Sequence, residues 1–312
     1  MRYRMLGKTG LSVSTLGYGA SPLGGVFGPV DEADAIRCVH TALDLGINYI
    51  DVAPYYGATK AEALLGKALR TVPRDRYYLS TKVGRYGQAD FDFSAPRVRR
   101  SIDESLSRLG VAYVDLLLCH DIEFGSLDQI VEETLPALRE IVGQGKARFI
   151  GITGLPLPIF PRVLDRADVD VVLSYCHYTL YDTSLDILLP YLNEKGVGVI
   201  NASPLGMGLL GDPGVLPDWH PAPPELRAAC ARAKTLCEAT GANLADLALA
   251  FSVARPDIHS TLVGSASAAQ MERNISALDR APGPELLAPV RHALRPVRDL
   301  SWPSGLPEND VW

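Results

Sequence analysis

The 312-residue chain has no hydrophobic run long enough to cross a membrane. Its apolar stretches, such as Val114 to Cys119 and Val197 to Ala202, have the length of strands, whereas a membrane-spanning helix needs about 20 apolar residues. The N-terminus, MRYRMLGKTG, lacks the apolar segment of a secretory signal. We therefore expect a cytoplasmic protein with no membrane partner.

Motifs for metal, disulfide or acyl-enzyme chemistry are also missing. The five cysteines include no CxxC pair, and Cys119 and Cys176 lie in apolar runs typical of buried thiols, which favours a reducing compartment. The chain has no HExxH and no GxSxG. We expect no metal site and no serine nucleophile. Basic residues are in deficit as well: the net charge of −6 argues against nucleic acid as a partner.

Short apolar runs alternate with amphipathic stretches along the whole chain. Strictly alternating strands and helices indicate βαβ units and a parallel sheet, and strands that are apolar throughout indicate a sheet covered on both faces. Eight such units predict a closed (β/α)8 barrel forming a single domain over residues 1–312, with a small hairpin in residues 1–14. The expected strands are Thr15–Ala20, Ile47–Val52, Tyr77–Lys82, Val114–His120, Ala147–Thr153, Val169–Cys176, Val197–Ala202 and Ser260–Gly264.

Helices are predicted between these strands, with Asp31 as the cap of the first. The expected ranges are Glu32–Leu45, Lys60–Leu69, Ala95–Leu109, Leu127–Gly143, Ile159–Arg166, Ser184–Glu194, Pro224–Thr240, Leu244–Ala254 and Ala268–Leu278. The tail from Trp302 to Trp312 is too aromatic for a free linker, so we expect it to pack beside the barrel mouth or a neighbouring subunit.

Four polar residues stand at or just beyond the carboxyl ends of three successive strands: Asp51, Tyr56, Lys82 and His120. Taken singly, each has an ordinary structural explanation, as a cap, a loop packing residue, a solvated lysine or a core histidine. Active sites of such barrels lie at this end of the strands, and the joint placement favours a functional site.

The quartet makes chemical sense as a proton-transfer centre. A tyrosine with a pKa of about 10 exchanges protons poorly at neutral pH, and a nearby ammonium favours its ionised form. Lys82 is therefore expected to lower the pKa of Tyr56, while Asp51 keeps Lys82 charged and oriented. His120 would hydrogen-bond the substrate oxygen.

Several segments, in this order, resemble the signature blocks of the aldo-keto reductases: DVAPYYG, STKVG, LLLCH, GITG, SPLGMGLL and LVGSASAAQMERN. The resemblance covers nearly the whole chain. The stretches CHDIEFGSLDQIV and LSYCHYTLYD are similar to those of aldose 1-dehydrogenases, a subgroup that includes enzymes acting on L-galactose. The resemblance implies Tyr56 as general acid or base and NAD(P) bound across the barrel mouth without a Rossmann domain, and we expect no GxGxxG after a strand.

The resemblance also implies cofactor contacts. The family block for the carboxamide is usually Ser-Asn and a Gln; here those positions hold Thr153, Gly154 and Tyr175, which puts the contacts in question. The remaining expected contacts are Ser174, Ser203, Leu205, Gly264, Ser265, Gln270 and Asn274. Relatives that prefer NADP place Lys and Arg where this chain has Gly264 and Gln270, and Arg273 is expected to point elsewhere. We therefore expect NAD, with NADP as the alternative.

The predicted substrate is a small aldose oxidised at its anomeric carbon to the lactone, with Tyr56 as base. An aromatic wall with a few polar groups suits a sugar. The expected contacts are Phe27, Asp121, Phe124, His177, Trp219 and His220. Two alternatives stay open: an NADPH-dependent aldehyde or ketone reductase, and a cofactor-binding regulatory subunit without turnover. The oligomeric state is left open.

Overall fold

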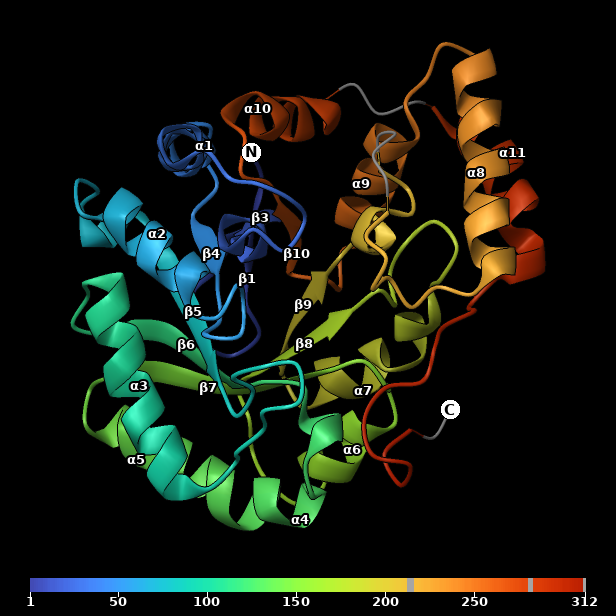
Figure 1. Ribbon diagram of the computed structural model, residues 1–312. Helices are drawn as coiled ribbons and strands as arrows, with labels where there is room; N and C mark the ends of the chain where they lie inside the picture. Colours follow the sequence, from blue (N-terminus) through green and yellow to red (C-terminus); the bar gives the residue numbers. More distant parts are fainter. Residues whose placement is uncertain (212–215, 280–282, 311–312) are drawn as a thin grey trace.

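The computed structural model describes residues 1–211, 216–279 and 283–310, and it confirms the predicted barrel (Figure 1). Eight parallel strands close in the order β10-β3-β4-β5-β6-β7-β8-β9. Each lies within two residues of its predicted start and end. Their bounds are β3 Leu16–Gly19, β4 Tyr49–Asp51, β5 Tyr78–Val83, β6 Val114–Cys119, β7 Ala147–Gly154, β8 Val171–Tyr175, β9 Gly198–Ala202 and β10 Ser260–Gly264.

Helices surround the barrel and bury their apolar faces against the outer side of the strands (Figure 1). Asp31 caps the first of them as predicted, because its carboxylate accepts the N–H of Asp34. The bounds are α1 Glu32–Asp44, α2 Lys60–Leu69, α3 Ala95–Leu109, α4 Leu127–Gln129, α5 Leu135–Gly143, α6 Ile159–Leu164, α7 Leu189–Glu194, α8 Pro224–Ala239, α9 Leu244–Ala254, α10 Ala268–Ala277 and α11 Pro284–Leu294. Within the described residues, every helix is too short or too polar to cross a lipid bilayer.

Two of the predicted helices need correction, and a further helix was not predicted. The stretch Leu127–Gly143 is interrupted by a π-helical turn at Ile130–Thr134, where the Thr134 hydroxyl donates to the carbonyl of Phe93. The stretch predicted from Ser184 begins as a 3-10 turn, Ser184–Ile187, before α7. Helix α11 was not predicted; it carries Pro289 in its interior and packs beside α8 (Figure 1).

The N-terminal hairpin is present as predicted and covers the amino-terminal end of the barrel. Strands β1 (Tyr3–Met5) and β2 (Ser12–Ser14) pair antiparallel. The buried side chains of Leu6, Leu11 and Val13 join the cluster that fills the barrel interior. The hairpin therefore closes one end of the barrel, and the chemistry predicted above lies at the other.

Strand register explains how the site is assembled. Asp51 pairs with Ser80 across β4 and β5, and Lys82 lies two residues further along β5. Side chains two residues apart share a face, so Ser80 and Lys82 both point to the side occupied by Asp51. Just beyond β6, Asp121 has φ of 49°, a left-handed conformation that turns the chain away from the strand direction.

Candidate active site

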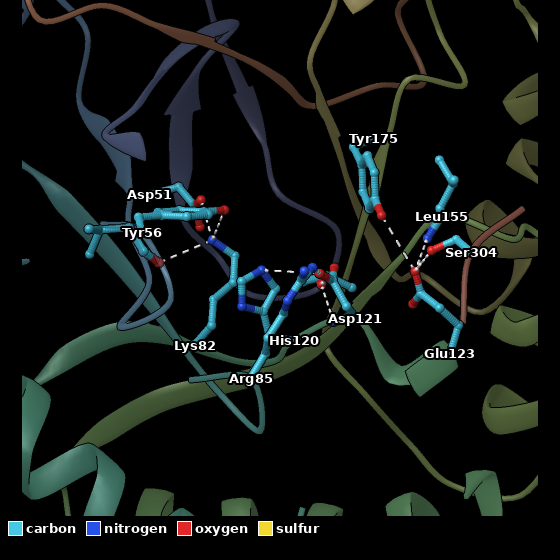
Figure 2. Close-up of polar contacts among 12 residues, drawn as sticks. Asp51, Tyr56, Lys82, Arg85, His120, Asp121, Glu123, Leu155, Tyr175 and Ser304 are labelled. Atoms are coloured by element: carbon cyan, nitrogen blue, oxygen red, sulfur yellow. Dashed lines mark hydrogen bonds and ion pairs between the residues drawn. The ribbon is translucent and has the colours of Figure 1, made fainter. Parts of the chain in front are cut away.

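The mouth of the barrel brings the four predicted catalytic residues together (Figure 2). Lys82 Nζ lies 2.5 Å from Asp51 Oδ2 and 3.1 Å from Tyr56 Oη. It also donates to the carbonyl of Val52 at 3.0 Å. The ammonium thus has one acceptor for each of its three protons, and this fixes the position of the Tyr56 hydroxyl.

The Asp51–Lys82 pair is buried and well supported. The Ser80 hydroxyl donates to Asp51 Oδ1 at 2.6 Å, so both carboxylate oxygens have partners. Burial alone would lower the pKa of Lys82, but Asp51 and Tyr56 outweigh it and the pKa is raised. Lys82 therefore stays a charged ammonium at any physiological pH.

Tyr56 departs from the prediction in its protonation. Burial raises its pKa to about 12, and the lowering effect of Lys82 only partly offsets this. The sequence-based expectation of a lowered pKa is wrong, because desolvation of the phenolate was not included. At rest Tyr56 is a phenol, held by the ammonium that would stabilise its ionised form.

His120 completes the constellation on the side away from Asp51. Its ring meets the Tyr56 ring edge to face, with centroids 5.7 Å apart. Burial lowers the pKa of His120 to about 3, so the imidazole is neutral. Its Nδ1 atom has no hydrogen-bond partner among the described residues. His120 thus adds a neutral imidazole directly against the Tyr56 ring.

A cavity of about 670 Å³ runs from this centre between the ends of β9, β10 and β3. Asp51 and Tyr56 lie in its wall, and Gln270 and Arg273 of α10 also line it. The predicted cofactor contacts that line it are Ser203, Leu205, Gly264, Ser265 and Gln270.

The cavity fits an extended dinucleotide. Ser203, Ser265 and Ser267 line it, and the last two directly precede the amino end of α10, where backbone N–H groups favour phosphate. At Gly264 a Cβ atom would come within 2.8 Å of Pro22, so the wall there admits only glycine. These residues would hold the cofactor. Gly206 to Gly211 does spell GxGxxG, but it forms a 3-10 turn after β9 and opens no helix.

Four predicted cofactor contacts lie outside the described lining of this cavity. Thr153 is engaged with Asp121, whose N–H donates to the hydroxyl at 2.9 Å. Tyr175 donates towards Glu123 at 3.4 Å, and the buried Asn274 amide accepts from Gln270 at 2.8 Å. The Ser174 hydroxyl is buried with no partner among the described residues. The absent amide at Gly154 has a physical reason: a Cβ there would lie 2.8 Å from Glu123 Oε2.

Arg273 also differs from the prediction, since it lines the cavity and donates to Gln270 Oε1. The helical register set by Asn274 points residue 273 elsewhere on α10, but the long arginine side chain reaches back to the cavity. Two carboxylates, Asp31 and Asp34, line the same cavity. Arg273 therefore shares this wall with two carboxylates, of which Asp34 is also paired with Arg37 at 3.2 Å.

The predicted substrate contacts divide into two groups. Phe27 and Trp219 lie at the mouth, about half exposed, with ring centroids 5.8 Å apart. Asp121 adjoins His120, and Phe124 stacks on Phe91 with centroids 4.4 Å apart. These four remain candidates for a sugar site.

Two histidines predicted to bind substrate do not reach such a site. His177 is fully buried, and its Nδ1 contacts Asp182 and Ser184 within the turn after β8. His220 is buried and uses both ring nitrogens on backbone groups, the carbonyl of Gly206 and the N–H of Ala222. Both imidazoles hold loops in place, which the sequence did not reveal because their partners are largely backbone or local turn groups.

Three residues at the mouth were not predicted: Tyr55, Arg85 and Glu123. The Arg85 guanidinium lies 3.9 Å from the Tyr55 ring centroid and forms an ion pair with Asp121. Glu123 is completely buried. The sequence could have indicated Arg85 and Glu123, because each follows the carboxyl end of a strand by two to four residues.

The C-terminal segment packs against the loop after β6, as expected for a tail near the mouth; Trp312 lies outside the described residues. Trp302 is buried against His220, with centroids 5.8 Å apart. The Ser304 hydroxyl donates to Glu123 Oε1 at 3.0 Å. The Asn309 amide donates to the carbonyls of Glu123 and Gly125. The segment thus covers Glu123 (Figure 2).

We expect Glu123→Gln to remove a pH dependence of stability. Burial, helped by Asp121, raises the pKa of Glu123 to about 8 from an ordinary value of 4.5. The neutral carboxyl is favoured in the fold, so this stabilisation is complete below pH about 4.5 and is lost as the pH rises towards 8. At about 1.4 kcal/mol per pKa unit, the loss amounts to a few kcal/mol.

Thermal unfolding at pH 5.5 and 8.5 tests this. The wild type should lose several degrees of Tm more than Glu123→Gln between the two conditions. Glu132→Gln, which replaces an exposed glutamate, serves as the control. An equal loss in all three proteins would contradict the assignment.

A barrel of this topology, with an Asp–Lys–Tyr contact at its mouth and a long cavity for a dinucleotide, defines a class of nicotinamide-dependent oxidoreductases. The chain belongs to the Aldo/keto reductase family, whose family model matches residues 15–285.

Individual relatives are close. The chain is 56% identical to the L-galactose dehydrogenase of Arabidopsis thaliana, over 98% of each protein. It is 30% identical to the D-threo-aldose 1-dehydrogenase of a Pseudomonas species, over 85% of this chain and 89% of the relative. Among solved structures it resembles the holo form of an aldo-keto reductase from Bacillus halodurans, with a TM-score of 0.80, 27% identity and full coverage of both chains.

Proposed function

We propose that this protein is an NAD-dependent aldose 1-dehydrogenase that oxidises L-galactose or a closely related sugar, such as L-fucose, to its lactone. The contact of Tyr56 with the Lys82 ammonium beside the neutral His120 is the observation that carries the proposal. The identity to an L-galactose dehydrogenase over almost the whole chain supports the choice of sugar.

The residues act on the anomeric hydroxyl of the cyclic sugar. His120 hydrogen-bonds this hydroxyl and orients it towards Tyr56. The phenolate form of Tyr56 takes the hydroxyl proton, and the C1–H bond breaks as the C1=O bond of the lactone forms. A nicotinamide held in the cavity would supply the hydride acceptor for C1. Lys82 stabilises the phenolate, and Asp51 holds Lys82 in position.

The cavity supports NAD over NADP. A 2′-phosphate carries about two negative charges and needs cationic partners, usually bidentate arginine. Arg273 is already engaged by Gln270, and the carboxylates of Asp31 and Asp34 line the same wall, with Asp34 partly balanced by Arg37. A ribose with free hydroxyls meets no such repulsion. The carboxylates of Asp31 and Asp34 are therefore proposed as the elements that disfavour NADP.

Absorbance at 340 nm tests substrate and cofactor together. We expect NAD reduction with L-galactose to be fastest in a panel with L-fucose, D-arabinose and L-rhamnose. With NADP, kcat/KM should be at least tenfold lower. Asp31→Asn combined with Asp34→Asn should raise kcat/KM for NADP by about tenfold, with little change for NAD, because asparagine still caps α1.

Other results would support the alternatives. Rapid NADPH oxidation with simple aldehydes and no sugar oxidation would indicate a carbonyl reductase. Tight cofactor binding without turnover would indicate a regulatory subunit. Either result overturns the proposed function.

A further inference from the structure

Arg85 occupies an aromatic pocket beside the catalytic residues. It follows β5 by two residues, and only 14% of its side chain is exposed. Its guanidinium carbon lies 3.9 Å from the ring centroid of Tyr55 and 5.3 Å from that of Phe124. Cation–π contacts on two sides hold the guanidinium in one place, which is more than solvation of a surface charge requires.

The guanidinium is paired with a carboxylate that is itself fixed. Arg85 Nη1 contacts Asp121 Oδ2. The other carboxylate oxygen accepts from the Thr153 hydroxyl at 3.2 Å, and that hydroxyl accepts the Asp121 N–H. Asp121 is only 4% exposed and stands in the left-handed backbone region. Three strand ends therefore converge on one buried ion pair (Figure 2).

The same carboxylate oxygen lies 3.7 Å from His120 Nε2. Asp121 Oδ2 is therefore shared between a permanent cation, Arg85, and a group that can become one, His120. A buried carboxylate without a counter-ion favours protonation of a neighbouring imidazole. Arg85 removes that driving force because it already neutralises the carboxylate.

We propose that Arg85 is a positioning residue: it neutralises Asp121 and so keeps His120 an uncharged imidazole able to orient the anomeric hydroxyl. The consequence for sugar oxidation rests on the proposed function, whereas the effect on the charge of His120 does not. An imidazolium here would add a cation beside Lys82 and would be held by Asp121, away from the substrate.

The other groups around His120 agree with this assignment. Lys82 is a fixed ammonium that disfavours a second cation, and Tyr55 and Tyr56 present neutral rings. Asp121 is the anion that favours imidazolium, and its charge also raises the pKa of Glu123 and of Tyr175. Burial, Lys82 and Arg85 together keep the pKa of His120 low against Asp121. Of these groups, Arg85 is the one in direct contact with Asp121 Oδ2.

An NMR titration of the full-length protein without cofactor or sugar tests the proposal. The His120 imidazole signal is assigned by its loss in His120→Asn, and its shift is followed from pH 5 to 9. In the wild type it should not titrate. In Arg85→Gln it should titrate with a midpoint inside this range, and in Arg85→Gln with Asp121→Asn it should again be silent.

Two further variants keep the test decisive. Arg85→Lys retains the charge, so the His120 signal should not titrate. This variant can be measured even if Arg85→Gln fails to fold. Arg291→Gln, which removes a guanidinium over the Phe251 ring far from the site, should leave the titration unchanged. A silent His120 in Arg85→Gln, or a titrating one in Arg85→Lys, overturns the proposal.

Kinetics provide the second readout. In Arg85→Gln, kcat/KM for the sugar should fall about tenfold below the wild-type value one pH unit below the NMR midpoint of His120, and it should approach the wild-type value at pH 9, because His120 loses its proton. A loss that is equal at both pH values would indicate a merely structural role. If the wild type failed to oxidise sugars while His120 still titrated in Arg85→Gln, the proposed function would be rejected. The effect of Arg85 on the charge of His120 would still stand.

Discussion

Tyr56→Phe should lower kcat for sugar oxidation by about 10²–10⁴-fold, the range that general acid–base groups contribute. Phenylalanine fills nearly the same volume, so the barrel mouth keeps its shape. The hydroxyl that contacts Lys82 at 3.1 Å is lost, and nothing at that position takes the proton from the anomeric oxygen. The affinity for NAD, measured by fluorescence quenching, should change less than threefold.

The same substitution should abolish a pH dependence. With the pKa of Tyr56 raised to about 12 by burial, the ionised fraction grows tenfold per pH unit throughout the neutral range. The wild-type rate should therefore rise steadily from pH 7 to pH 10, whereas the residual rate of Tyr56→Phe should stay nearly flat. Tyr55→Phe is the matched control, since it changes the neighbouring phenol. Turnover of Tyr56→Phe within tenfold of the wild type would refute the assignment.

Lys82→Met should reduce turnover at pH 7.5 by at least 10³-fold. The ammonium lowers the pKa of Tyr56 and hydrogen-bonds its oxygen, so its removal raises that pKa further. Asp51 is left buried without its partner, and an uncompensated buried charge costs about 3–5 kcal/mol. Steady-state rates and denaturant unfolding should therefore both be affected.

The double variant Asp51→Asn with Lys82→Met separates the two effects. It leaves no unpaired buried charge, so its free energy of unfolding should recover by most of that cost, while its turnover should stay as low as that of Lys82→Met. Recovery of turnover together with stability would mean that Lys82 acts only through the fold.

The barrel and the catalytic quartet could both be predicted from the sequence, and for the same reason. In parallel βα units the carboxyl ends of strands converge, so Asp51, Lys82 and His120 had to meet if the strands were correctly placed. Strand ends were well marked by apolar runs. Helix α11 was missed because Pro289 lies within it, and the proline penalty is outweighed there by packing against α8.

Charge and loop contacts were harder to predict. The raised pKa of Tyr56 depends on burial, which no spacing of residues reports. His220 was assigned to the sugar because it is polar and beside Trp219, but its ring is bound by the carbonyl of Gly206, 14 residues away. Arg85 and Asp121 meet only because β5 and β6 are neighbours in the barrel. The approach of Asp121 Oδ2 to His120 Nε2, at 3.7 Å, depends on side-chain positions that the sequence does not specify.

The attachment of the C-terminal segment to the loop after β6 has an evolutionary consequence. The Ser304 hydroxyl binds the carboxyl group of Glu123, a residue about 180 positions earlier in the chain, whereas Asn309 binds the main-chain carbonyl at 123, which any residue supplies. Residues in contact tend to covary. Homologues that have lost the carboxylate at 123 should therefore also have replaced residue 304, whereas Asn309 can be retained.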